Sequence, residues 1–242
     1  MSIQLKDSFL SLQQYISGLS INEALEKLNE AFPEQLVFST SFSYEDQVIT
    51  DYISETAIPV SIFTLDTGRL FPETYSTWSR TLERYQLTID AYYPQTEKLQ
   101  EFVREYGPNS FYESVENRKS CCHIRKVEPL KRALAGKAVW ITGLRAEHSP
   151  NRSDMQILEW DEANQIIKYN PLLHWATEEV RQYIDQRNVP YNALHDRGFV
   201  SIGCAPCTRA IKPGEDFRAG RWWWEDASKK ECGLHVHQTA TT

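Results

Sequence analysis

The chain has 242 residues, a formal net charge of −7, 41% hydrophobic residues and 24% charged residues. This size and composition are typical of one globular domain that buries its own core, and the acidic balance disfavours binding to duplex nucleic acid. No apolar run reaches about 18 residues and no signal-peptide pattern opens the chain, so we expect a cytoplasmic protein without a membrane span.

The first part of the chain alternates between helical and strand patterns. The first ~15 residues are expected to be poorly ordered, as chain ends often are. Ser20-Ile-Asn-Glu23 is a capping box, which predicts a helix with apolar residues at a helical period. Further helices are expected from about Glu45 and from Pro72 to about Tyr85, since proline suits the first turn of a helix. Strands are predicted at 36–38, 60–65, 88–93 and 138–142.

Strands that alternate with helices predict right-handed crossovers and a mostly parallel sheet, hence an α/β fold. In such sheets, ligands bind beyond the carboxyl ends of the strands. Three turns lie at such ends: one after Phe38, one at Asp66-Thr67-Gly68 and one at Gly143-Leu144-Arg145. We therefore expect these turns to converge on one crevice.

The last third of the chain has a different organisation. Thr177 is expected to cap a helix that runs to about Arg187, and the sequence after it is rich in glycine and proline. We interpret residues 1–242 as a single domain, in which residues 20–200 form a nucleotide-binding α/β core. Residues 201–242 are then an appended loop-rich segment that folds back over the crevice.

The turn after Phe38 joins a strand to a helix through small hydroxyl residues, in the order Ser39-Thr-Ser-Phe-Ser-Tyr-Glu45-Asp46. Backbone N–H groups and hydroxyls at a helix N-terminus can bind a phosphate, so this turn is a candidate nucleotide-binding loop. The alternative is an ordinary turn with serine caps. It is not a Walker A loop, because the G-x-x-x-x-G-K-[ST] pattern is absent.

Two further loops carry candidate ligand groups. Asp66 can accept a hydrogen bond from a ribose hydroxyl, or it can simply cap its own turn. Arg145 and Arg152 form a basic loop, for which a solvated surface role is the alternative.

The five cysteines are odd in number and clustered, which in a reducing compartment indicates metal binding or catalysis rather than disulfides. Cys121-Cys122 and Cys204-Ala-Pro-Cys207 together provide four thiolates, which suit either a tetrahedral zinc or a 4Fe–4S cluster. Adjacent side chains diverge, so the vicinal pair suits a cluster with separated irons better than one small ion. The spacing therefore favours the cluster.

Cys232 stands apart from these four, in Glu231-Cys-Gly-Leu-His235. A nucleophilic thiol needs access, and it needs nearby cations that lower its pKa. His235, Arg218 and Arg221 can supply this charge, and a position near the end of the chain lets the segment move between a substrate and a reductant. The alternative is an incidental free cysteine.

Taken together, these motifs resemble those of the assimilatory adenylyl-sulfate reductases. The matching residues are the two cysteine pairs together with Gly214-Glu-Asp-Phe-Arg-Ala-Gly-Arg-Trp-Trp-Trp224 and Glu231-Cys-Gly-Leu-His235, and the resemblance extends from about Leu36 to His235. It implies a Rossmann-like sheet of the adenine nucleotide alpha hydrolase type. It also implies one 4Fe–4S cluster per subunit, held by Cys121, Cys122, Cys204 and Cys207.

The resemblance further implies reduction of adenosine 5′-phosphosulfate to sulfite and AMP, a step of assimilatory sulfate reduction on the way to cysteine biosynthesis. Cys232 is then the nucleophile, an S-sulfonate is the intermediate, and thioredoxin or a similar dithiol releases sulfite. In this family the role of the cluster is electrostatic and structural. Neither nucleic acid nor a membrane is expected as a partner, and a homo-oligomer is left open.

On this basis, four groups are expected to surround the phosphosulfate and to stabilise the charge that develops on the leaving phosphate oxygen: Lys126, Arg218, Arg221 and His235. Adenosine is expected in the crevice. The residues expected to bind the substrate are Ser39, Ser41, Phe42, Ser43, Glu45, Asp46, Leu65, Asp66, Thr67, Gly68, Gly143, Arg145 and Arg152.

One position departs from the family pattern. The phosphate-binding loop usually reads Ser-Phe-Gly, and here it reads Ser41-Phe42-Ser43. Serine lacks the freedom of glycine at positive φ, so the loop is expected to sit differently at Ser43. The run Trp222-Trp-Trp224 is interpreted as core or interface packing.

Three other interpretations stay open. The first is the same chemistry on the 3′-phosphorylated nucleotide, or on both nucleotides. The second is a nucleotide-activating, tRNA-thiolating enzyme on the same type of sheet, although its usual Ser-Gly-Gly-x-Asp-Ser loop is absent. The third is a non-enzymatic binding module held together by zinc.

Overall fold

The structure, a computed structural model, describes residues 2–148, 154–226 and 234. Within these residues, six strands form one sheet in the order β3-β2-β1-β4-β6-β5. All neighbouring strands are parallel except β5, which pairs antiparallel with β6 at one edge. The strands are β1 (Leu36–Ser39), β2 (Val60–Leu65), β3 (Ile89–Tyr92), β4 (Val139–Ile141), β5 (Leu158–Asp161) and β6 (Ile166–Tyr169).

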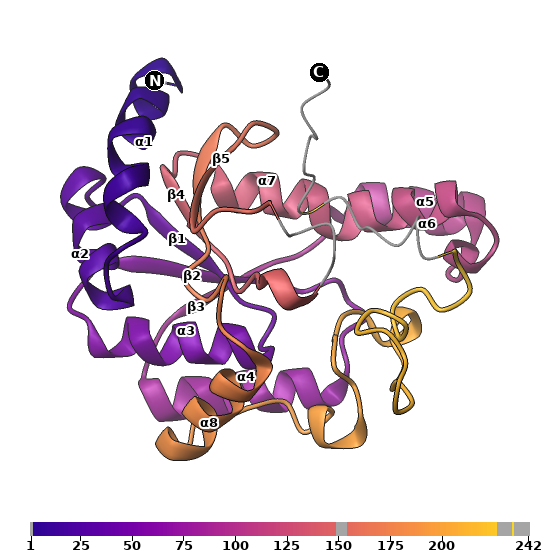
Figure 1. Cartoon of the computed structure of the whole chain (residues 1–242). Helices are drawn as coiled ribbons and strands as arrows, with labels where there is room; N and C mark the ends of the chain where they lie inside the picture. Colours follow the sequence, from indigo (N-terminus) through magenta and orange to yellow (C-terminus); the bar gives the residue numbers. More distant parts are fainter. Residues whose placement is uncertain (1, 149–153, 227–233, 235–242) are drawn as a thin grey trace.

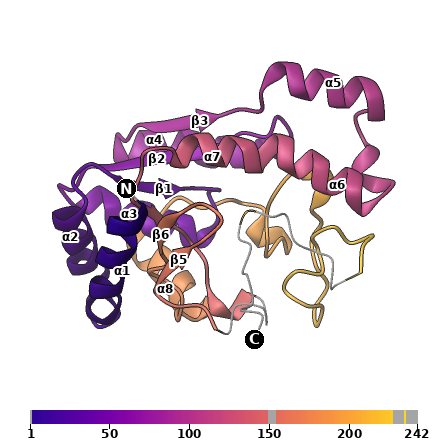
Figure 2. The same cartoon turned by 90° about the horizontal axis from the view of Figure 1, so that it is seen from above.

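Helices cover both faces of this sheet (Figure 1). α7 packs on β2 and β3, with α5 and α6 on the same side, while α2, α3, α4 and α8 cover the other face, as Figure 2 also shows. None of the described helices is long and apolar enough to cross a membrane. The α-helices are α1 (Ser2–Ile16), α2 (Ile21–Ala31), α3 (Tyr44–Glu55), α4 (Pro72–Tyr85), α5 (Thr96–Tyr106), α6 (Val115–Cys122), α7 (Glu128–Leu134) and α8 (Thr177–Arg187).

Alternate residues of the strands pack into two separate hydrophobic cores, because successive side chains of a strand point to opposite faces of the sheet. Leu36 and Phe38 of β1 pack with the layer of α2, α3 and α8, whereas Val37 packs with Trp140 and the side chains of α7. Both faces of the central strands are thus buried, as expected for a parallel sheet. The predicted mostly parallel α/β fold is confirmed.

The predicted helices and strands before residue 142 agree with the structure within one or two residues. The Ser20–Glu23 capping box is present and opens α2. In α8 the expected cap is wrong by one residue, because Ala176 is the N-cap and Thr177 is the first helical residue.

The expectation of a poorly ordered N-terminus is wrong for residues 2–16, which form α1. Phe9 and Ile16 are buried, and the helix packs against β5 and β6. The hairpin of β5 and β6 was not predicted, because its strands carry charged residues. Glu159 and Lys168 form an ion pair of 3.0 Å across the two strands, and Lys168 is buried with its Nζ over the ring of Trp140.

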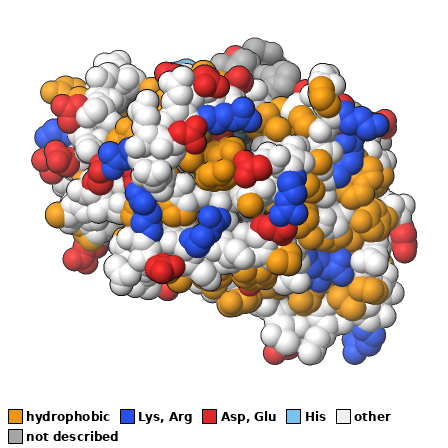
Figure 3. All heavy atoms as spheres, turned by 90° about the horizontal axis from the view of Figure 1, so that it is seen from below, with side chains coloured by type: hydrophobic (Ala, Val, Ile, Leu, Met, Phe, Trp, Pro, Cys, Tyr) orange, Lys and Arg blue, Asp and Glu red, His pale blue; other side chains and the backbone are white. Residues whose placement is uncertain are grey.

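The segment after α8 consists of turns and short 3-10 helices, η5 (His195–Arg197) and η6 (Ala205–Cys207). It folds back on itself through an isolated bridge between Thr208 and Arg221, and it is tied to the core where Ala205 N donates to Arg69 O at 2.8 Å. Figure 3 shows hydrophobic and basic side chains interspersed on the right of the molecule, the side on which this segment lies in Figure 1.

Asp51 of α3 joins three helices. Its carboxylate is buried and accepts hydrogen bonds from Tyr85 of α4 at 2.7 Å and from Tyr183 of α8 at 2.8 Å, and it pairs with Arg187. We expect Asp51→Ala to lower the free energy of unfolding by about 2–4 kcal/mol, because three donors lose a buried acceptor. Urea unfolding measures this loss.

The matched control is Glu55→Gln, which removes the exposed carboxylate that pairs with the same Arg187. A surface pair contributes little, so this change is expected to cost about 0–1 kcal/mol. Equal losses for the two variants would contradict the role of Asp51 as a buried junction.

Candidate active site

A cavity of about 230 Å³ lies at the carboxyl ends of β1, β2 and β4, where the chain reverses its direction across the sheet. Such a reversal is the usual ligand site of a parallel sheet. The segment after α8 covers the cavity from outside. Its lining includes Ser39, Thr40, Ser41, Ser43, Glu45, Asp46, Thr64, Leu65, Lys126, Thr142, Gly143, Leu144, His148, Val200, Ser201, Ile202, Gly203, Phe217, Arg218, Arg221 and Trp222.

The loop between β1 and α3 borders the cavity at the positions that the sequence indicated. Ser39, Ser41 and Ser43 line it, whereas Phe42 is fully buried and stacks on Trp78 with ring centroids 5.6 Å apart. The backbone of Ser43 has φ −70°, so this position needs no glycine. Serine therefore fits here without backbone strain, and the positive φ of 60° falls on Phe42 instead.

Asp46 holds this loop closed. Its Oδ2 accepts hydrogen bonds from Ser41 N at 2.6 Å and from Ser41 Oγ at 2.7 Å. A Cβ on Gly143 would lie 2.2 Å from Asp46 Oδ1, so the turn after β4 needs a glycine here. Burial, assisted by the charge of Glu45, raises the pKa of Asp46 to about 6 against the effect of the Ser41 donors.

Arg145 does not line the cavity. It is buried, and its guanidinium donates to Glu45 at 2.9 Å, to Glu147 at 2.5 Å and to Thr177 at 2.8 Å. The alternative of a solvated surface role is therefore wrong for Arg145. Its side chain supports the cavity wall from behind. Burial raises the pKa of Glu45, but the hydrogen bond from His148 and the nearby charges outweigh it and lower the pKa to about 2.

The turn after β2 contributes less to the cavity than expected. Leu65 lines it, but Asp66, Thr67 and Gly68 do not. Asp66 caps its own turn by accepting from Gly68 N at 2.8 Å, and it accepts from the hydroxyl of Tyr75 at 2.9 Å. The hydroxyl oxygen of Thr67 lies 3.3 Å from the sulfur of Cys204, so the side chain of Thr67 faces the cysteines.

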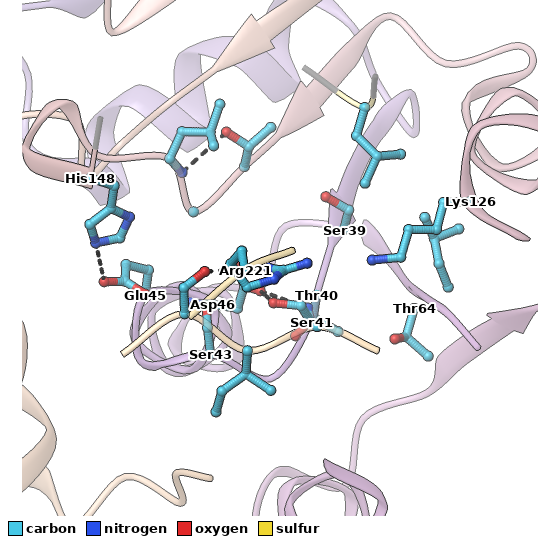
Figure 4. A pocket seen from close by; sticks show the side chains of 18 of the residues that line it. Ser39, Thr40, Ser41, Ser43, Glu45, Asp46, Thr64, Lys126, His148 and Arg221 are labelled. Carbon is cyan, nitrogen blue, oxygen red and sulfur yellow. Dashed lines mark hydrogen bonds and ion pairs between the residues drawn. The ribbon is translucent and has the colours of Figure 1, made fainter. Parts of the chain in front are cut away.

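Three cations reach the cavity from two distant parts of the chain. Lys126 comes from the turn before α7, and Arg218 and Arg221 come from the segment after α8. Figure 4 shows the side chains of Lys126 and Arg221 reaching into the same part of the cavity, away from His148 and Glu45. A Cβ on Gly203 would lie 2.3 Å from Nη2 of Arg221, so glycine makes room for this guanidinium.

The four predicted metal ligands line one smaller cavity beside the first. Cys121 and Cys122 end α6, and the chain then continues as one π-helical turn, η2 (His123–Val127), into α7. Short π-helical segments occur frequently at functional sites. Cys204 and Cys207 approach from η6. The remaining lining residues are four basic ones and two apolar ones: Arg69, Arg118, Arg125, Lys126, Phe111 and Pro206. Lys126 borders both cavities.

The chemistry of these donors fits a soft metal centre. Burial raises the pKa of Cys207 to about 12, and it also raises that of Cys121 against the charge of Arg125. Binding of a metal replaces these protons, since the thiolate is the ligand. In the described part of the chain, no three His, Cys, Asp or Glu side chains are placed to hold a metal ion. One zinc needs all its sulfurs at about 2.3 Å, whereas the thiolates of a cluster bind separate irons.

Three predicted site residues, Arg152, Cys232 and His235, lie outside the described residues. Several residues that line the cavity were not predicted from the sequence. Thr40, Thr64 and Thr142 follow a recognisable pattern, because each is a hydroxyl residue at the carboxyl end of a predicted strand. No local pattern indicated His148, which stacks on Phe217 at 4.1 Å, or the run from Val200 to Gly203.

The raised pKa of Asp46 predicts how stability changes with pH. The pKa of this carboxyl is about 6 in the folded chain and 3.8, its ordinary value, in the unfolded chain. The protonated carboxyl therefore favours the folded state, and the free energy of unfolding falls as the pH rises from about 4 to about 6. Asp46→Asn avoids this loss. We expect the difference in free energy of unfolding between Asp46→Asn and wild type to shift in favour of the variant between pH 4 and pH 7, by at most about 3 kcal/mol.

Urea unfolding of both proteins over this pH range tests the expectation, with the exposed Asp185→Asn on α8 as the control for removal of one carboxylate. A difference between Asp46→Asn and wild type that does not change with pH would contradict it.

Comparisons with known proteins agree with this architecture. Residues 35–210 match the phosphoadenosine phosphosulfate reductase domain. The chain is 49% identical to the adenosine 5′-phosphosulfate reductase of Allochromatium vinosum, over 90% of this chain and 86% of the relative. It is 51% identical to the protein of the same name from Agrobacterium fabrum, over 93% and 86% of the two chains.

Among solved structures, the phosphoadenylyl-sulfate reductase of Candida auris in a phosphate complex is similar, with a TM-score of 0.71, 33% identity and coverage of 84% of this chain and 96% of that one. The FMN adenylyltransferase of Candida glabrata shares only the fold, at 16% identity, a TM-score of 0.53 and coverage of 98% and 78%. On these grounds, the chain belongs to the phosphoadenosine phosphosulfate reductase domain family.

Proposed function

We propose that this protein reduces adenosine 5′-phosphosulfate to sulfite and AMP in assimilatory sulfate reduction, with a dithiol such as thioredoxin as the electron donor. One observation carries the proposal: Lys126 borders both the cavity at the ends of the strands and the cavity of the four cysteines. The names of the relatives, adenosine 5′-phosphosulfate reductases at about half identity, support the choice of substrate.

The cavity offers different partners to the two ends of such a substrate. Hydroxyls and carboxylates gather around Ser39, Ser41 and Asp46, where they can bind the hydroxyls and ring nitrogens of a nucleoside. The side chains of Lys126, Arg218 and Arg221 supply three positive charges for the phosphosulfate. We assign the nucleoside to the first region and the anion to the second, because each region matches the chemistry of its ligand.

The proposed reaction has two steps. The thiolate of Cys232 attacks the sulfur of the phosphosulfate, a sulfur–sulfur bond forms, and the bond from sulfur to the phosphate oxygen breaks, so that AMP leaves. One thiolate of a dithiol then attacks the sulfur of Cys232, so that a mixed disulfide forms and sulfite leaves. The second thiolate of the dithiol attacks the donor sulfur of this mixed disulfide, which forms the disulfide of the oxidised donor and releases the thiolate of Cys232. The donor loses two electrons, the sulfonate sulfur gains them, and the thiol protons pass to the solvent.

The cations have a defined task in the first step. Negative charge grows on the phosphate oxygen as AMP leaves, and preorganised donors in a cavity sheltered from water stabilise it strongly. The position of Lys126 and Arg221 in the cavity wall supports this proposed role. His235 and Arg152 are proposed on the family resemblance alone.

We further propose that Cys121, Cys122, Cys204 and Cys207 hold a 4Fe–4S cluster. When bound, the cluster supplies electrostatic stabilisation beside Lys126 rather than electrons. The surrounding arginines favour this assignment, since they offset the negative charge that four thiolates bring. A reducing compartment such as the cytoplasm would keep the thiols available.

The role of Cys232 is tested by mass measurement. After anaerobic incubation with adenosine 5′-phosphosulfate and no reductant, the wild type is expected to gain one SO₃ group on Cys232. Cys232→Ser is expected to bind AMP normally and to gain none, because a hydroxyl is a far weaker nucleophile than a thiolate. Normal sulfite production by Cys232→Ser would rule out the assignment.

The metal content tests the cluster. Anaerobically purified protein is expected to contain about four irons and four acid-labile sulfides per chain, and Cys204→Ser is expected to lose most of both. Cys232→Ser serves as the control and should keep them. Stoichiometric zinc without iron would support the zinc-held module instead.

The 3′-phosphorylated nucleotide is a second candidate substrate, because the matched family and the similar Candida auris protein are named after it. The same mass measurement, run with each nucleotide at equal concentration, separates the two by their rates of S-sulfonation. Consumption of ATP without S-sulfonation would favour a nucleotide-activating enzyme.

A further inference from the structure

A buried ion pair beside the four-cysteine cavity takes no direct part in the two steps above, although its Arg118 lines that cavity. Arg118 Nε lies 3.0 Å from Glu225 Oε1, and Arg118 Nη2 lies 2.8 Å from Glu225 Oε2. The side chains are 0% and 3% exposed, respectively. Two parallel hydrogen bonds between a guanidinium and a carboxylate fix their relative orientation as well as their distance. The pair therefore joins α6 rigidly to the segment after α8.

The pair lies close to both cysteine elements. Arg118 is one helical turn before Cys122 and interacts with its thiol. The guanidinium of Arg118 also lies 4.8 Å from the ring centroid of Trp222, whose backbone N–H donates to the carbonyl of Cys207 at 3.2 Å. Arg118 thus belongs to the helix that carries Cys122 and contacts the tryptophan that is hydrogen-bonded to Cys207.

The same tryptophan contacts the cations of the larger cavity. Arg221 and Arg218 lie 4.8 Å and 5.8 Å from the ring centroid of Trp222. Trp222 is 2% exposed and has φ +40°, a conformation that a bulky residue keeps only when its surroundings hold it. Glu225 N donates to Trp222 O at 2.9 Å, so the residue paired with Arg118 closes the turn that contains this conformation.

We propose that Arg118 and Glu225 are positioning residues, which hold the Trp222 turn in place and thereby aim Arg218 and Arg221 at the substrate. The inference rests on the proposed function for its effect on S-sulfonation, but not for its effect on the structure around Cys207. Neither residue lines the larger cavity, so neither is expected to touch the nucleotide.

Two variants of the whole chain test the proposal. Glu225→Gln keeps the shape of the side chain and removes its charge, and Arg118→Lys keeps the charge and removes the two-pronged geometry. For either variant that circular dichroism shows to be folded, we expect the rate of S-sulfonation by adenosine 5′-phosphosulfate to fall about 10- to 100-fold, because small displacements of catalytic groups have effects of this size. The affinity for AMP should change less than about threefold.

Hydrogen–deuterium exchange provides a readout that depends neither on activity nor on the thiol of Cys207, which a bound cluster would block. Trp222 N donates to Cys207 O and Glu225 N donates to Trp222 O, so exchange of these two amides requires the turn to open. In the anaerobically purified whole chain, mass spectrometry is expected to show exchange in this turn at least about tenfold faster in each folded variant than in wild type.

The matched control is Glu215→Gln. Glu215 also forms a two-pronged pair in the same segment, with Arg209, but this pair is partly exposed and lies outside both cavities. Its loss is expected to change neither measurement more than about twofold.

The outcomes separate the two proposals. If Glu225→Gln and Arg118→Lys exchange and react like Glu215→Gln, the positioning role is wrong. If the wild type forms no S-sulfonate, the proposed function fails, and faster exchange in the Trp222 turn of the variants alone then supports the role of the pair. A loss of AMP affinity equal to the loss of rate would instead indicate general damage to the cavity and overturn the proposal.

Discussion

The parallel pairing of β1 with β4 is the constraint on which both cavities depend. The chain leaves β1 toward β2 and β3, and it must return across the sheet before β4 can pair on the other side of β1. That return passes through α5, α6 and α7, and it delivers the two vicinal cysteines and Lys126 to the edge where the strands end. The loops after β1 and β4 separate at this edge and leave the space that the larger cavity fills.

Side chains of both charge signs line the larger cavity. Carboxylates lie beside the loop after β1, where Arg145 and His148 hold Glu45 and where Ser41 holds Asp46. The cations Lys126, Arg218 and Arg221 come from other parts of the chain. Under the proposed function, the hydroxyls and carboxylates would bind the nucleoside and the cations would bind the phosphosulfate.

Much of the fold follows from local patterns, and much of the site does not. The capping box at Ser20 and the runs 36–38 and 60–65 have short-range causes, so the sequence predicts them well. The direction in which a loop side chain points has long-range causes. Asp66 turns toward Tyr75 and away from the cavity, and Arg145 is drawn inward by Glu45, a hundred positions earlier in the chain.

The same limit explains the strands that were missed. Lys168 is accommodated in a buried strand because it pairs with Glu159 and lies over the ring of Trp140. No pattern in the neighbouring residues indicates these partners. The four cysteines were grouped correctly because their chemistry is shared whatever lies between them in the sequence. Their place beside Lys126 depended on how α6 continues into α7.

The π-helical turn from His123 to Val127 determines this continuation. An α-helix advances by about 100° per residue, and a π-helical turn accommodates one additional residue without interrupting the helix. Deletion of a single residue within this turn would restore the regular spacing and rotate Lys126 around the axis relative to Cys122. Insertions and deletions are usually tolerated best in loops, but here one residue of a continuous helix sets the rotation of Lys126, which borders both cavities, relative to the cysteines that line the smaller one. The distance along the chain from Cys122 to Lys126 is therefore as much a part of the site as the side chains themselves.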